Sequence, residues 1–204
     1  MRRVTVTAER LAAWIDGFSE RHGASLADAT ATQVELTGAD GARAWLDIPF
    51  PPMSSTGDAC ADLVQHVQQR RTVGVLLVRR RAHAVGVFDG VELIASKVDT
   101  NYVQSTTKAG GWSQQRYARR RANQAQAAFQ DAADTATRVL LPVALDALIC
   151  GGDRSAVDAV LADPRLRDLR ALRCEPFLVV PDPRLRVLQA TPEQFRAVRI
   201  SLDP

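Results

Sequence analysis

Three strand-like segments follow one another closely in the middle of the chain, and they constrain the fold most strongly. Thr72–Val78 is almost continuously apolar, Ala84–Phe88 is a second apolar segment, and Val91–Lys97 is a third. Asp89-Gly90, which separates the second from the third, is a dipeptide typical of tight hairpin turns. We therefore predict a meander of antiparallel strands. This arrangement differs from the strand–loop–helix start of a phosphate-binding fold.

A long helix is predicted after the meander, over Ser113–Leu140. Its small and apolar residues recur at helical spacing and form one stripe, which consists of Ala118, Ala122, Ala125, Phe129, Ala132, Ala136 and Leu140. A further buried strand is predicted to end at Cys150-Gly151-Gly152. Strands combined with helices in this order predict an α/β protein, with a mixed β-sheet flanked by helices.

The first seventy residues follow a different pattern. Apolar residues at helical spacing predict a helix over Thr7–Arg21, and Gln33–Leu36 and Ala42–Ile48 alternate like the two strands of a hairpin. We therefore predict an N-terminal helix plus β-hairpin extension over residues 1–70 and a main domain over residues 71–204. One continuous globular unit is the alternative.

The composition is that of an ordinary globular protein, because 46% of the 204 residues are hydrophobic and 24% are charged. The longest apolar stretches, such as Val73–Val78 and Val139–Cys150, are too short to cross a bilayer, so we expect no membrane association. Cys60, Cys150 and Cys174 are odd in number and far apart. We therefore expect neither a zinc site nor a disulfide framework, and we expect a reduced, cytoplasmic compartment.

The positive charge of the chain is gathered in one segment. Residues 101–130 contain no Asp or Glu, and their basic residues are Lys108, Arg116, Arg119, Arg120 and Arg121. This segment carries a charge of +5, whereas the rest of the chain has 21 basic against 23 acidic residues. A solvated helix face is the usual interpretation of a basic run. The complete absence of acids over this length nevertheless favours a polyanionic partner.

Motifs for self-sufficient hydrolysis or nucleotide binding are missing from the sequence. His22, His66 and His83 have no metal-ligand spacing, so we interpret each as a structural or surface residue. The sequence has no GxSxG nucleophile elbow, no Walker-type glycine loop and no GxGxxG motif. We therefore expect no metal and no cofactor. An enzyme with this sequence has to take part of its chemistry from its partner.

The most informative segment is Lys108-Ala-Gly-Gly-Trp-Ser-Gln-Gln-Arg-Tyr-Ala-Arg-Arg-Arg121, at the start of the predicted long helix. It resembles the Gly-Gly-Gln loop and the following Ser-x-x-Arg-Phe-x-Arg-x-Arg segment of archaeal and eukaryotic class I peptide release factors. Trp112 stands where those factors have their Gln, and the glutamines come two and three positions later. This GxxQ form, Gly111-Trp-Ser-Gln114, is similar to the Vms-like release factors of ribosome quality control, and most of all to their actinobacterial branch.

The resemblance covers about residues 72–180 and implies a release-factor-like catalytic domain. It implies a peptidyl-tRNA hydrolase that releases nascent chains from stalled large ribosomal subunits, with peptidyl-tRNA and rRNA as partners. Gln114 is implied to orient the water that attacks the peptidyl-tRNA ester, and the backbone of Gly110 and Gly111 to approach the reacting atoms. The residues implied to contact RNA are Lys108, Trp112, Arg116, Arg119, Arg120 and Arg121.

Several alternatives stay open at the level of sequence. Gln115 is adjacent to Gln114 and competes with it as the catalytic glutamine. Release can also proceed by cleavage of the tRNA near its 3′ end, and a non-catalytic ribosome-binding or RNA-binding module has the same basic segment. Gly110-Gly111 can be a simple turn, and Trp112 can pack against the domain. The sequence does not indicate an oligomeric state.

Overall fold

The computed structural model describes residues 2–79, 82–100 and 113–203, with the backbone alone described at residue 100 and along 113–123. The chain forms two compact units, one made of Met1–Arg70 with Pro192–Pro204 and one of Arg71–Thr191. The predicted main domain starts at the same position, residue 71. Its predicted extent to residue 204 differs from the structure, because the last strand pairs inside the sheet of the first unit.

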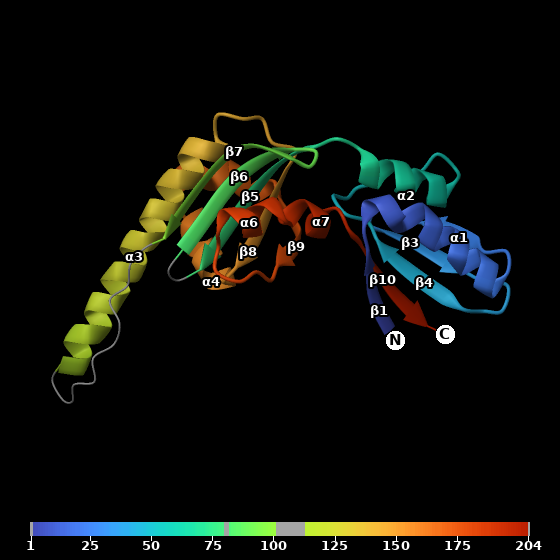
Figure 1. Cartoon of the computed structure of the whole chain (residues 1–204), viewed down its shortest axis with the longest axis horizontal. Coiled ribbons are helices and arrows are strands. Elements are labelled where there is room, and N and C mark those ends of the chain that lie inside the picture. Colours follow the sequence, from blue (N-terminus) through green and yellow to red (C-terminus); the bar gives the residue numbers. More distant parts are fainter. Residues whose placement is uncertain (1, 80–81, 101–112, 204) are drawn as a thin grey trace. The chain divides into compact units, whose positions relative to one another are not determined.

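The first unit is a five-stranded sheet with helices packed on one face (Figure 1). Its strands occur in the order β1-β10-β4-β3-β2, and every neighbouring pair is antiparallel. The elements are β1 (Arg2–Val6), η1 (Ala8–Arg10), α1 (Leu11–His22), β2 (Leu26–Ala29), β3 (Gln33–Thr37), β4 (Arg43–Asp47), α2 (Ala59–Gln68), most of α7 (Thr191–Phe195) and β10 (Val198–Asp203). The predicted N-terminal helix and hairpin are therefore confirmed as α1 and the pair β3 and β4.

Alternating side chains of this sheet bury one face against the helices. Val34 and Leu36 of β3 are fully buried together with Leu46 of β4. Leu11 and Phe18 of α1 pack into the same cluster. A strand with this alternation has one buried and one solvated face, which explains why the helices cover only one side.

The second unit is a mixed sheet with the strand order β7-β6-β5-β8-β9. The pairs β5–β6 and β6–β7 are antiparallel, whereas β5–β8 and β8–β9 are parallel. Its elements are β5 (Thr72–Arg79), β6 (Ala82–Asp89), β7 (Glu92–Thr100), α3 (Ser113–Leu140), β8 (Ala147–Gly152), α4 (Arg154–Leu161), η2 (Pro164–Leu166), α5 (Arg167–Ala171), β9 (Arg173–Leu178) and α6 (Leu185–Gln189). The predicted meander is confirmed as β5, β6 and β7, and the predicted long helix as α3.

The starts of the two central parallel strands are fixed to each other. The backbone N–H of Thr72 donates to a carboxylate oxygen of Asp146 at 2.7 Å, and the N–H of Asp146 donates to the carbonyl of Thr72 at 2.8 Å. The six residues of β5 from Val73 to Val78 are all buried. A strand that is buried on both faces typically has a continuous apolar sequence, and β5 has one.

Helices cover both faces of the mixed sheet. Leu140 of α3 and Val157 of α4 lie in one cluster with Val85 and Val87 of β6. Gly86 lies between these two valines, so a side chain at position 86 would point to the other face of the sheet. A Cβ at Gly86 would come within 2.9 Å of Leu188 Cδ2, so α6 covers that second face. The predicted α/β class, a mixed sheet flanked by helices, is confirmed.

Candidate functional site at the start of the long helix

The helix α3 is anchored to the second unit by its C-terminal half. Ala132, Ala136 and Leu140 are fully buried at a spacing of four residues, and Ala128 is the first buried residue among the described side chains of the helix. Ser113, where the helix begins, is fifteen residues before Ala128, which is roughly 22 Å along a helix axis. Figure 1 shows that the first turns of α3 extend beyond the strands of the sheet. The arginine-rich N-terminal half of the helix is therefore held in place by the buried C-terminal half.

A buried polar contact fixes the base of α3 to the sheet. His83 Nε2 on β6 lies 3.2 Å from Thr135 Oγ1 on α3, and both residues are 2% exposed. Burial lowers the pKa of His83 from its usual value, and Asp99 and Asp131 oppose this shift. The imidazole is thereby held neutral near physiological pH, where it can exchange a hydrogen bond with a hydroxyl group.

A network of ion pairs joins the same part of α3 to the segment that follows α4. One Nη atom of Arg165 lies 2.6 Å from Asp134 of α3 and 2.7 Å from Asp163, which caps η2. Hydrogen bonds from Arg165 lower the pKa of both carboxyl groups, and Asp134 and Asp163 raise the pKa of Arg165. A hollow beside this network is lined by Asp99, Asp131, Asp134, Thr135, Thr137, Arg138 and Arg165.

Charge is distributed unevenly along α3. Asp131 is the first acidic residue after Asp99, so the acids of α3 are confined to its buried half. Four of the five arginines of α3 occupy the first turns, where the helix dipole disfavours cations, and Arg138 lies in the last turn. An anion that approaches these turns would offset that cost, because helix N-termini attract phosphate groups. The charge of the helix is therefore divided, with arginines in its N-terminal turns and the carboxylates in its C-terminal half.

The sequence-predicted residues fall into two groups. Gln114, Gln115 and Arg116 lie in the first turn of α3, and Arg119, Arg120 and Arg121 lie in the second and third turns. The structure thus brings these six residues together on consecutive turns of one helix. Lys108, Gly110, Gly111 and Trp112 lie outside the described residues.

The thiol groups of the chain are poor nucleophiles. Burial raises the pKa of the Cys150 thiol to about 12 and that of Cys174 to about 11. Burial also raises the pKa of Cys60, and Asp58 adds to the shift. Because the thiolate is the reactive form, none of the three is activated for covalent catalysis.

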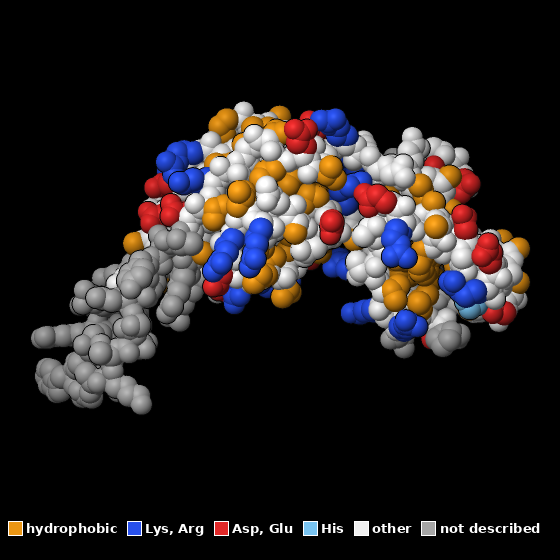
Figure 2. Space-filling model, viewed as in Figure 1, with side chains coloured by type: hydrophobic (Ala, Val, Ile, Leu, Met, Phe, Trp, Pro, Cys, Tyr) orange, Lys and Arg blue, Asp and Glu red, His pale blue; other side chains and the backbone are white. Residues whose placement is uncertain are grey.

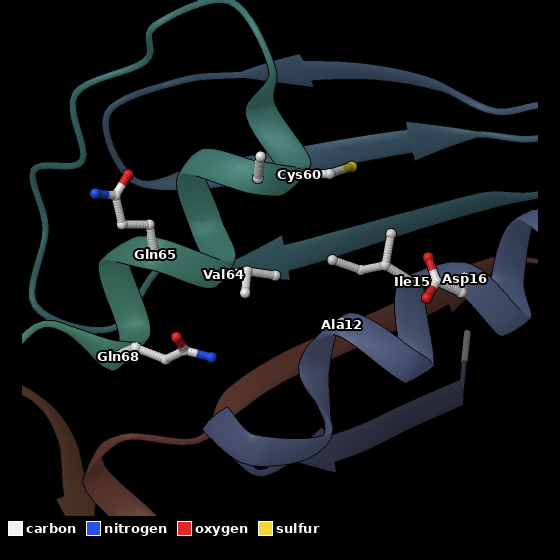
Figure 3. A pocket seen from close by; sticks show the side chains of 8 residues that line it. Ala12, Ile15, Asp16, Cys60, Val64, Gln65 and Gln68 are labelled. Carbon is white, nitrogen blue, oxygen red and sulfur yellow. The ribbon is translucent and has the colours of Figure 1, made fainter.

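The first unit has a hollow of its own between α1 and α2, which Figure 3 shows from close by. Its lining is mainly apolar and amide, and consists of Ala12, Ile15, Asp16, Cys60, Ala61, Val64, Gln65 and Gln68. The lining holds neither a histidine nor a pair of carboxylates. Asp16 is its single carboxylate, and no partner in the lining pairs with Asp16 as a second acid–base group.

The described part of the chain holds neither a metal-binding cluster nor a membrane-spanning helix. Across residues 2–79, 82–100 and 113–203, there is no group of three or more His, Cys, Asp or Glu side chains arranged to hold a metal ion. Helices of the length and apolarity that a membrane crossing requires are absent from the same part of the chain.

The comparison with protein families decides the identity of the chain. Residues 71–201 match the model of the Actinobacteria/chloroflexi VLRF1 release factors, acVLRF1. The chain belongs to the acVLRF1 family. This match confirms the resemblance to actinobacterial Vms-like release factors that rests on the Gly-Gly-Trp-Ser-Gln-Gln-Arg block. The acVLRF1 match starts at Arg71, where the second unit starts, and it extends into β10 of the first unit.

Solved structures are similar to part of this chain. An archaeal translation termination factor, aRF1, is 18% identical, with a TM-score of 0.46, over 76% of this chain and 45% of its own. A second structure, described as an archaeal protein, is 16% identical, with a TM-score of 0.42, over 78% of this chain and 50% of its own. The chain thus spans about half the length of these structures. The search of curated proteins finds no match.

The contacts that hold the C-terminal half of the acVLRF1 helix α3 were not predicted from the sequence. His83 was interpreted as a structural or surface residue, and the structure shows it buried against Thr135, 52 positions later. Arg165 and Asp134 are separated by 31 positions. Pairs so distant carry no local signal, so only the tertiary fold reveals them.

Proposed function

We propose that this acVLRF1 protein is a ribosome-dependent peptidyl-tRNA hydrolase that releases nascent chains from stalled large ribosomal subunits. The observation that carries the proposal is the Gly-Gly-Trp-Ser-Gln-Gln-Arg block at the start of α3 in a chain of a release-factor family. Such an activity takes place in the cytoplasm, where peptidyl-tRNA forms.

Gln114 is proposed to position the attacking water. An amide side chain does not titrate near neutral pH, so it cannot act as a strong general base, but it can donate and accept hydrogen bonds. The backbone N–H groups of Gly110 and Gly111 are suited to face the oxyanion that develops during attack on the ester. The water oxygen bonds to the ester carbonyl carbon, and the bond from that carbon to the tRNA oxygen then breaks. The leaving tRNA oxygen takes one proton of the water and becomes a hydroxyl group, and the other proton stays with the new carboxyl group of the peptide until it ionises to solvent.

The proposed mechanism relies on positioning and needs no strong acid or base from the chain. The described thiols are protonated, and the described His83 is buried at the opposite end of α3 from Gln114. Ribosomal RNA supplies the rest of the proposed site. Correct placement of a reactant contributes a large part of the rate acceleration in such cases.

The shape of α3 supports this assignment of roles. Ser113 at its start lies roughly 22 Å along the helix axis from Ala128, the first buried residue among its described side chains, and Arg116 and Arg121 lie roughly 18 Å and 10 Å from Ala128. A helix of this kind can reach into an RNA-lined channel while its base stays fixed. Arg116, Arg119, Arg120 and Arg121, with Lys108, are proposed to contact phosphate groups, and Trp112 to stack on a base.

A release assay tests the proposal. The purified chain is added to stalled large-subunit complexes that carry labelled peptidyl-tRNA, beside its Gln114→Ala and Gln115→Ala variants. Gln126→Ala is the matched control, because Gln126 is an exposed glutamine on the same helix. We expect Gln114→Ala to abolish release and retain binding, and Gln126→Ala to behave like wild type. Full release by both Gln114→Ala and Gln115→Ala contradicts the proposal.

The products separate this function from its two competitors. An intact CCA end on the released tRNA indicates ester hydrolysis, whereas a shortened tRNA indicates cleavage near the 3′ end. Binding with a steep salt dependence and no release at any concentration indicates an RNA-binding module without catalysis.

A further inference from the structure

A second groove in the first unit lies between the strand β1 and the helix α1. One wall is the segment Val4–Thr7, and the other consists of Arg10, Ala13, Trp14 and Arg21. Figure 2 shows hydrophobic side chains gathered between these two elements, with Lys and Arg side chains around them. No residue of this lining belongs to the site at the start of α3.

The strand β1 forms an edge of its sheet. It pairs with β10 over five residues on one side, and in the described part of the chain no strand pairs with its other side. An edge strand presents a row of backbone N–H and C=O groups to a further strand. The opposite edge, β2, differs from β1 because α2 packs against it.

The groove is formed by well-fixed side chains. Val6 is buried, and Val4 and Trp14 are half-buried against the core of the unit. Trp14 is held by stacking on Phe18, with ring centroids 5.9 Å apart and planes inclined by 21°. Ala13 is exposed and small, so it leaves room beside the strand.

The charge of the groove is positive at both ends. Arg10 and Arg21 are eleven residues apart on one side of η1 and α1, about 16 Å along a helix, and a five-residue strand spans about 17 Å. The lining contains no Asp or Glu, and neither arginine has a carboxylate partner among the residues that the structure describes. Arg2 and Arg3 are exposed on β1 itself.

We propose that this groove binds an extended acidic peptide, which pairs with β1 as a sixth strand. The free edge of β1 provides the backbone hydrogen bonds, Val4 and Trp14 receive apolar side chains, and Arg10 and Arg21 pair with carboxylates. This mode of recognition takes its affinity from the main chain and its specificity from alternate side chains. A single-stranded RNA fits less well. One face of Trp14 is already covered by Phe18, and an RNA would leave the edge of β1 without partners.

Fluorescence anisotropy with the full chain tests the proposal. The probe is a fluorescein-labelled eight-residue peptide of alternating glutamate and valine. Comparison peptides replace each glutamate with lysine, or carry N-methyl groups on alternate backbone amides. A labelled octauridylate is the RNA comparison. We expect the glutamate peptide to bind, and both comparison peptides to bind at least tenfold more weakly.

A matched pair of variants locates the binding. Ala13→Glu puts a carboxylate into the groove. Ala12→Glu puts a carboxylate at the preceding residue of α1, which lines the hollow between α1 and α2. Both alanines are exposed, so neither change enters the core. We expect Ala13→Glu to weaken binding at least tenfold, Ala12→Glu to weaken it less than twofold, and the double variant Arg10→Ala with Arg21→Ala to weaken it about tenfold.

Hydrogen exchange identifies strand pairing directly. Bound glutamate peptide should slow amide exchange in the segment that contains Arg2–Val6, and a peptide held by charge alone would leave that exchange unchanged. The proposal is overturned by absence of binding, by equal effects of Ala13→Glu and Ala12→Glu, or by unchanged exchange in β1. Binding of octauridylate in preference to the peptide also overturns it and identifies the groove as an RNA surface.

Discussion

Thr135 Oγ1 on α3 lies 3.2 Å from His83 Nε2 on β6, and both side chains are almost fully buried. This contact joins the base of the long helix to the middle of the meander. We expect Thr135→Val to lower the free energy of unfolding by about 1–2 kcal/mol, since it leaves a buried imidazole without its partner. Urea unfolding measures the loss.

Thr137→Val is the control for that variant. The hydroxyl group of Thr137 donates to the carbonyl of Ala133 within the same helix, and its side chain is half-buried. We expect a change of less than about 0.5 kcal/mol there. Equal losses in the free energy of unfolding for Thr135→Val and Thr137→Val would show that the contact with His83 adds no stability of its own.

The stability of the second unit should fall as the pH falls below about 6.5. Burial lowers the pKa of His83 in the folded state from its ordinary value of 6.5. As the pH falls, His83 therefore takes up its proton near pH 6.5 in the unfolded chain and only at a lower pH in the folded chain. The stabilisation is complete above pH 6.5 and declines from there toward the folded pKa.

Urea midpoints between pH 8 and pH 5 measure this dependence. The variant His83→Gln should lose the part of the slope that lies between pH 6.5 and pH 5. A slope that persists unchanged in His83→Gln would assign it to other groups.

Gly152→Ala should destabilise the second unit by more than about 3 kcal/mol. Gly152 has a φ of +96°, and a Cβ at this position would fall against the carbonyl oxygen of Val78 on the neighbouring strand. Gly41→Ala is the control, because Gly41 has a φ of +88° with no atom within 4 Å of the added Cβ. We expect Gly41→Ala to lower the free energy of unfolding by about 1 kcal/mol, from backbone strain alone. Thermal unfolding compares the two variants, and similar losses would rule out the steric explanation.

Asp62 should stabilise the loop that precedes α2. Its carboxylate accepts hydrogen bonds from the backbone N–H and the hydroxyl of Thr56, both at 2.6 Å, and from the hydroxyl of Ser55 at 3.1 Å. Hydrogen bonds from Thr56 lower the pKa of Asp62 from its usual 3.8. Its contribution is therefore complete above about pH 3.8 and is lost as the pH falls toward the lower, folded pKa.

We expect Asp62→Asn to lower the urea midpoint at pH 7, where the carboxylate is charged. The control is Asp28→Asn, which changes an exposed carboxylate on β2. The difference between Asp62→Asn and wild type should shrink at the lowest pH at which the protein stays folded. A constant difference across pH would argue against a role for the charge.

Local patterns in the sequence predicted much of the fold. The apolar run of β5, the Asp89-Gly90 turn and the stripe along α3 each depend on neighbouring residues, and each is confirmed by the structure. The strands β1 and β2 were not predicted, because Arg2–Val6 and Leu26–Ala29 are short and largely exposed.

Tertiary pairing set the limit of prediction. The position of β10 between β1 and β4 depends on contacts across more than 150 residues, and so does the ion pair of Arg196 with Glu9, at 3.0 Å. For the candidate site, the block at the start of α3 and its family were predicted from the residues. Which glutamine acts remains a prediction, to be decided by the release assay.

The central place of β10 has a consequence for how the molecule is made. Because β10 lies between β1 and β4, the sheet of the first unit cannot close before residues 198–203 have left the ribosome. By then the complete sequence of the second unit, residues 71–191, has already emerged. During its own synthesis the second unit can therefore fold first, and the first unit waits with β1 and β4 unjoined.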